Sequence, residues 1–152
     1  LIQQDQNMST KEIQEELVEK MKQWQKIEDA SLASTGKIMA ATDNKLIRLV
    51  MEIIQIDSQM HHRVQDFVVG SLEREPITVT PDDMSAVWSA IEDHIKIEKR
   101  MVEYVSGTLE KLKGKKMMVQ EYLLNYLKTD EEKHDKLLED LEAIKKGMYP
   151  YG

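Results

Sequence analysis

The chain has 152 residues, of which 41% are hydrophobic and 32% are charged, and its formal net charge is −7. This balance is typical of a folded globular protein, and the length suits one domain over residues 1–152 that needs no covalent staples. The acidic charge argues against a nucleic-acid or anionic membrane partner. The lack of cysteine excludes disulfides, thiolate metal sites and iron–sulfur clusters.

Targeting signals are not apparent in the sequence. No apolar run approaches the roughly 18 residues that a membrane span requires, and no secretory signal pattern is visible. We therefore expect a cytoplasmic protein, although the chain begins at Leu1 and not at Met.

Apolar residues recur with a helical period almost throughout and predict four long helices. The first runs over 9–39, where Ser9 caps the helix and Glu12 completes a capping box. A tight turn is expected at 41–44. The main stripe of this helix comprises Ile13, Leu17, Met21, Trp24, Glu28 and Leu32.

A second helix is predicted to follow this turn, with Thr42 or Asp43 as its cap, and to run to Leu72. Pro76 cannot continue a helix, so 74–79 is predicted to be an extended crossover. The stripe of the second helix comprises Leu46, Val50, Ile53, Asp57, Met60, His61, Val64 and Phe67.

The second half of the chain predicts another pair of helices. The third helix begins at Pro81 with Thr80 as its cap, and a short turn lies at Gly114. The fourth helix covers 116–146 and stops at Gly147. The predicted fold is therefore all-α, a four-helix bundle of two antiparallel hairpins joined by one long crossover. A plain up-and-down bundle remains an alternative.

Ionisable residues interrupt these stripes at positions that should be apolar. Several buried, unpaired carboxylates in one small core would be too costly, so these groups must be paired or must bind a cation. The stripes offer no lysine or arginine at the same levels. The interrupting residues are Glu28, Asp57, His61, Glu98, Asp130, Glu131 and His134.

The interruptions belong to an internal repeat. The tripeptide Lys-Ile-Glu at 26–28 recurs at 96–98. The Asp and the His at the two ends of 57–61 recur at the two ends of 130–134. The shifts are 70 and 73, and we place the three additional residues in the second turn.

The repeat also indicates how far from its turn each of these residues lies in its hairpin. Residues equally distant from a turn face each other across an antiparallel helix pair. Glu28 and His61 are equally distant from the first predicted turn, and Glu98 and His134 from the second. We therefore expect Glu28 to face His61 and Glu98 to face His134.

This arrangement resembles the ferritin, bacterioferritin and rubrerythrin superfamily. That family takes one Glu from each of two helices and a Glu-x-x-His from each of the other two. Glu98 and Glu131-x-x-His134 match one half, and Glu28 with His61 matches most of the other. The resemblance implies a ferritin-like fold with a two-iron site, manganese being the alternative metal.

The family also places an Asp before each Glu-x-x-His. The resemblance therefore implies that Asp57 and Asp130 hold the opposing His rings through hydrogen bonds. One position departs from the pattern, because Ser58 stands where a bridging Glu belongs. The site then holds two metals unequally or only one, unless His94, one turn before Glu98, replaces the missing ligand.

The function implied is an oxidase, ferroxidase or peroxidase that acts on oxygen or peroxide. Electrons would come from a separate partner or from ferrous iron, since the chain has no Cys-ligated domain. Two alternatives stay open: iron storage in a shell, and a non-catalytic bundle with a degraded site. We favour a homodimer over a cage, because the additional short helix of classical cages is not seen after the fourth helix.

Overall fold

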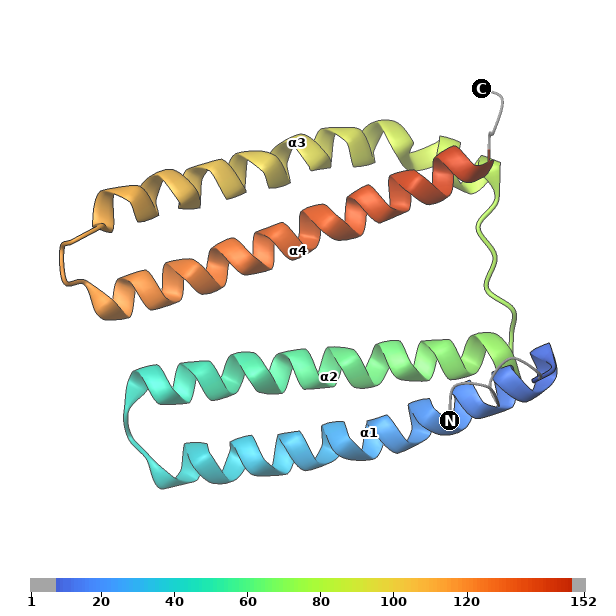
Figure 1. Ribbon diagram of the computed structural model, residues 1–152, viewed down its shortest axis with the longest axis horizontal. Helices are drawn as coiled ribbons and strands as arrows, with labels where there is room; N and C mark the ends of the chain where they lie inside the picture. The colour runs from blue at the N-terminus through green and yellow to red at the C-terminus, as the bar shows by residue number, and fades with distance from the viewer. Residues whose placement is uncertain (1–7, 149–152) are drawn as a thin grey trace. The chain divides into compact units, whose positions relative to one another are not determined.

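The computed structural model describes residues 8–148 and contains no strand within them, which confirms the all-α prediction. The chain divides at Ile77–Thr78 into two compact units, and each is an antiparallel helical hairpin. No helix of the described part is both long and apolar enough to cross a membrane. The four helices in Figure 1 are α1 (Thr10–Ala41), α2 (Lys45–Glu73), α3 (Pro81–Leu112) and α4 (Met118–Met148).

Two helices begin with capping boxes, and the box at Ser9 was predicted from the sequence. The Ser9 hydroxyl accepts from the backbone N–H of Glu12 at 3.2 Å, and the Glu12 carboxylate accepts from the N–H of Ser9 at 3.3 Å. Thr80 and Asp83 form the equivalent pair at the start of α3, at 3.1 and 2.9 Å. These contacts satisfy N–H groups that have no partner inside the helix.

The cap of α2 differs from the prediction. Asn44 holds this position, and neither Thr42 nor Asp43 does. The Asn44 Oδ1 atom accepts from the N–H groups of Leu46 and Ile47 at 3.0 and 3.1 Å. Asn and Asp cap equally well, so the sequence alone did not separate neighbouring candidates. The Thr42 hydroxyl instead accepts from the Asn44 N–H at 3.1 Å.

The ends of α4 also differ from the prediction. Gly147 does not stop the helix, which continues to Met148, because a glycine stop needs a positive φ that Gly147 does not adopt. Positive φ angles among the described residues occur at Gly114 (73°) and Lys116 (55°), both in the α3–α4 turn. The left-handed conformation of Lys116 delays the start of α4 to Met118.

Each hairpin is held by one interhelical interface, and the two interfaces follow the internal repeat. The α1 residues that are buried or half-buried at heptad-like spacing recur on α3 with the shift of 70, and those of α2 recur on α4 with the shift of 73. On α1 they are Val18, Met21, Gln25, Glu28, Leu32, Thr35 and Met39. On α2 they are Met51, Gln55, Ser58, His62, Gln65 and Val69.

The first interface is unusually polar. Its most buried members include Glu28, Thr35, Ser58 and Gln65, against only Val18 and Val69 among apolar residues. Many residues of the predicted stripes do not face the other helix of their own hairpin. Trp24 of α1, for example, is 50% exposed. The α1–α2 pair alone therefore leaves most of its apolar surface uncovered, and the hydrophobic contribution to its stability is small.

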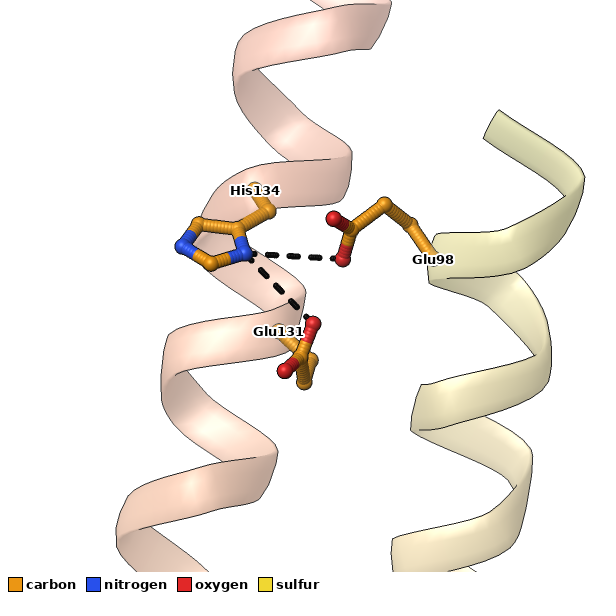
Figure 2. Close-up of side chains that lie close together, drawn as sticks. All are labelled: Glu98, Glu131 and His134. Atoms are coloured by element: carbon orange, nitrogen blue, oxygen red, sulfur yellow. Dashed lines mark ion pairs between the residues drawn. The ribbon is translucent and has the colours of Figure 1, made fainter. Parts of the chain in front are cut away.

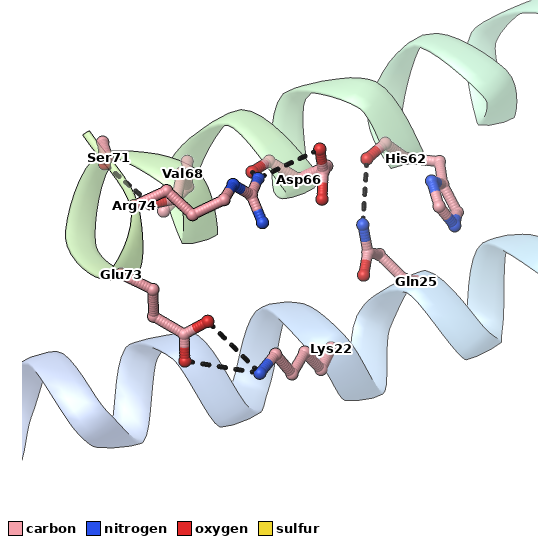
Figure 3. A network of polar contacts seen from close by, with 8 residues as sticks. All are labelled: Lys22, Gln25, His62, Asp66, Val68, Ser71, Glu73 and Arg74. Atoms are coloured by element: carbon pink, nitrogen blue, oxygen red, sulfur yellow. Dashed lines mark hydrogen bonds and ion pairs between the residues drawn. The ribbon is translucent and has the colours of Figure 1, made fainter. Parts of the chain in front are cut away.

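Polar contacts between α1 and α2 supplement this interface near the end of α2 (Figure 3). The Lys22 Nζ atom lies 3.3 Å from the Glu73 carboxylate, and the Gln25 side chain donates to the backbone oxygen of His62 at 3.2 Å. Exposed ion pairs of this kind contribute at most about 1 kcal/mol. They help to fix the register of the hairpin more than its stability.

Candidate metal centre

Glu98, Glu131 and His134 lie together between α3 and α4 (Figure 2). Glu131 and His134 are three residues apart on α4 and therefore share one face of the helix. The His134 Nδ1 atom lies 3.5 Å from Glu98 Oε2 and 3.4 Å from Glu131 Oε2. One ligand atom from each residue lies within 4.8 Å of the others. The expectation that Glu98 faces His134 is confirmed.

Two carboxylate oxygens in this cluster lack hydrogen bonds. The Oε2 atoms of Glu98 and Glu131 are shielded from solvent and have no hydrogen-bond partner among residues 8–148. Glu98 is only 4% exposed. Buried polar atoms without hydrogen bonds are destabilising, so two of them side by side form a place where a cation would be stabilising. Both atoms approach the same imidazole nitrogen, as ligands of one cation would.

The two carboxyl groups influence each other's ionisation. Side-chain interaction with the neighbouring Glu131 carboxyl lowers the pKa of Glu98, despite the opposing effect of burial. The Glu98 carboxyl and burial together raise the pKa of Glu131. Glu131 therefore releases its proton at a higher pH than Glu98, because two adjacent carboxylates shielded from water resist carrying two negative charges.

Other predicted site residues surround this cluster. The His94 Nε2 atom lies 3.0 Å from Glu98 Oε1, but His94 is not part of the group of converging ligand atoms. Asp130 Oδ2 lies 3.5 Å from His134 Nε2 on the same helix. The predicted bonds from Asp57 and Asp130 to the opposing His rings would join the two hairpins and stay a prediction.

The α1–α2 hairpin holds the equivalent half of the pattern. The His61 Nδ1 atom lies 3.2 Å from Glu28 Oε1, as the levels in the sequence predicted. The Gln65 amide also donates to Glu28 Oε1, at 3.4 Å. Ser58 occupies the position of Glu131 and is 4% exposed, and its hydroxyl lies 3.1 Å from that of Ser31. This half therefore offers one carboxylate and one imidazole.

Gln65 was not among the residues predicted to belong to the site. Its interface position follows Ser58 by seven residues, and this spacing was the available signal. In the other hairpin the corresponding residue is Leu138. The amide of Gln65 gives Glu28 a neutral donor that Glu98 does not receive at that level.

Comparison with family models, with curated proteins and with solved structures finds no match to this chain. The functional argument therefore depends on the residues and their geometry. Two carboxylates and one imidazole form a mixed oxygen and nitrogen ligand set that suits iron, manganese or zinc.

Proposed function

We propose that this protein binds a divalent transition metal ion through Glu98, Glu131 and His134. The observation that carries the proposal is the pair of unpartnered Oε2 atoms of Glu98 and Glu131 beside one nitrogen of His134. These residues fit a metal because the cluster supplies three donor atoms with no ammonium or guanidinium group among them. Binding would require Glu131 to lose the proton that its neighbour favours.

Glu28 and His61 are the second part of the proposal. In a ferritin-like four-helix bundle, these two residues would join the α3–α4 cluster and complete a site for two metal ions. Each hairpin carries the apolar surface that such packing needs. On α3–α4, an open groove of about 540 Å³ adjoins Glu131. Its apolar lining comes mainly from Ile97, Met101, Tyr104, Leu124 and Leu127.

Ser58 makes the two proposed metal positions unequal. The α3–α4 hairpin supplies three ligands, whereas the α1–α2 hairpin supplies two and has a neutral hydroxyl at the position of Glu131. We therefore expect one tightly bound metal ion and a weaker second one. The same observation favours a second candidate function, in which the protein holds a single ion without redox chemistry.

The proposed activity is that of an oxidase, ferroxidase or peroxidase. Iron bound as a pair supplies the electrons that reduce oxygen or peroxide. The residues of the chain would hold the metal and take up or release a proton at the Glu131 carboxylate. A separate electron donor or ferrous iron would complete the reaction.

Metal content tests this proposal most directly. Purified protein would be loaded separately with ferrous, manganous and zinc ions, desalted and subjected to elemental analysis. We expect retention of at least one ion per chain, and its loss in Glu131→Gln and His134→Ala. The matched control is Glu132→Gln, because Glu132 is the adjacent carboxylate and is half-exposed. Equal retention in all variants, or none in the wild type, would refute the proposal.

A further inference from the structure

One side of α2 is apolar although it points away from α1. Leu49, Ile56, Met60 and Phe67 fall within a sector of about 40° on the helix, since successive residues turn by 100°. This sector, the outer face of α2, lies roughly 160° from the side that contacts α1. The four side chains are 41%, 58%, 52% and 59% exposed. An apolar side of a surface helix is normally covered by another apolar surface.

The internal repeat shows that the hairpin itself does not require this apolar face. With the shift of 73, the counterparts of the outer face on α4 are largely polar. The counterparts of Leu49, Ile56, Met60 and Phe67 are Tyr122, Thr129, Lys133 and Asp140. The two hairpins share their interface positions and their metal-ligand pattern but differ here, so the outer face serves a contact that only α2 makes.

Two charged residues flank the outer face, at nearly equal distances along the helix from its centre. Glu52 and Arg63 lie on one edge of the face, within about 20° of each other around the helix. Neither makes an ion pair within residues 8–148. When two identical helices pack antiparallel around a two-fold axis, each pair of residues that meet has the same sum of residue numbers. That sum is 116 for Leu49 with Phe67 and for Ile56 with Met60, and 115 for Glu52 with Arg63.

We infer that the outer face of α2 binds the outer face of a second copy of this chain, antiparallel and around a two-fold axis near Ser58. Each Glu52 would then meet Arg63 of the second copy, which gives two equivalent ion pairs. A parallel two-fold arrangement would place the charged edges of the two helices on opposite sides of the contact, so that Glu52 and Arg63 could not pair. Such self-complementarity is what a two-fold contact requires of a surface.

The dimensions of the face suit this contact. Eighteen residues separate Leu49 from Phe67, which corresponds to about 27 Å of helix. At the Phe67 end, an open groove of about 360 Å³ is lined by Arg63, Phe67 and Ile77 among others. Leu49 of the second copy would reach this groove. The inference uses only the α1–α2 hairpin and its repeat, so it does not depend on the proposed metal function.

The first test measures mass in solution by light scattering and sedimentation, over a range of concentrations. We expect about 35 kDa, twice the 17.7 kDa of one chain. In the variant Ile56→Thr with Met60→Lys, which takes the residues found at the equivalent α4 positions, we expect the single-chain mass. Circular dichroism would verify that this variant keeps its helices. A wild type that is a single chain at every concentration, or a variant that remains a dimer, would overturn the inference.

Charge reversal tests the antiparallel pairing specifically. Glu52→Arg and Arg63→Glu should each weaken the dimer by about tenfold or more, because each places like charges together twice. The double variant should restore it. Lys136→Glu, at the α4 position equivalent to Arg63, should leave the mass unchanged. Failure of the double variant to restore the dimer would indicate a different occupant of the face.

Metal content measured in the same samples separates the two proposals. A dimer without metal would reject only the proposed function. A single chain that retains metal would reject only the second-copy contact.

Discussion

The hydroxyl groups of Ser31 and Ser58 lie 3.1 Å apart, at the level where the other hairpin carries a carboxylate. We predict that Ser58→Glu restores the missing ligand and raises the metal content of the loaded protein from about one to about two ions per chain. Without metal, the new buried carboxylate should lower the melting temperature. Elemental analysis and thermal unfolding with and without metal measure both effects.

Ser58→Ala is the control for this substitution. It removes the same hydroxyl without adding a ligand, so it should not raise the metal content. If Ser58→Glu destabilises the protein equally with and without metal, the position does not face a metal ion.

Metal retention should depend on pH through Glu131. The neighbouring Glu98 carboxylate and burial raise the pKa of Glu131, so metal-free protein keeps this proton to a higher pH than an ordinary Glu would. Metal requires the ionised form, and binding therefore strengthens as the pH rises through the pKa of Glu131. At pH values below the pKa of Glu131, calorimetry in buffers with different ionisation enthalpies should show proton release on metal binding. Because Glu131→Gln is expected to lose the metal, it should give no binding signal at any pH.

Replacing both buried carboxylates should stabilise the metal-free protein. Glu98→Leu combined with Glu131→Leu removes two buried oxygens that lack partners and adds apolar contact between α3 and α4. We expect the free energy of unfolding to rise by about 1–3 kcal/mol and metal binding to be lost. Urea unfolding of metal-free samples measures this change. A decrease in stability would mean that the carboxylates are satisfied within the fold.

The start of α3 should lose stability in acid. Hydrogen bonds from the backbone and side chain of Thr80 lower the pKa of Asp83 below its ordinary value. A lowered folded pKa gives a contribution that is present above the unfolded value and is lost as the pH falls through the folded value. Asp83→Asn keeps an acceptor but does not titrate. The stability difference between wild type and Asp83→Asn should therefore shrink below about pH 4.

The sequence was sufficient to predict the four helices and the level of each Glu and His pair. Helical periodicity and capping chemistry are local, and Ser9 and Thr80 act as predicted. The shifts of 70 and 73 identified equivalent positions, and burial follows both shifts. The choice of Asn44 as a cap was not predictable, because adjacent residues cap equally well.

The sequence also did not reveal which apolar residues face which neighbour. Helix α2 is apolar over so much of its surface that a stripe could be drawn along several directions. The polar interface with α1 was therefore overlooked, and with it the amide of Gln65 beside Glu28. The union of the two half-sites depends on tertiary packing and stays a prediction.

The polar interface between α1 and α2 has a consequence for synthesis. The ribosome completes this hairpin before α3 exists, and its interface buries Glu28, Thr35, Ser58 and Gln65 with few apolar residues. The nascent hairpin should therefore be only weakly stable, with the apolar side chains of α2 exposed to other chains. We expect translation to pass through a stage that benefits from chaperones.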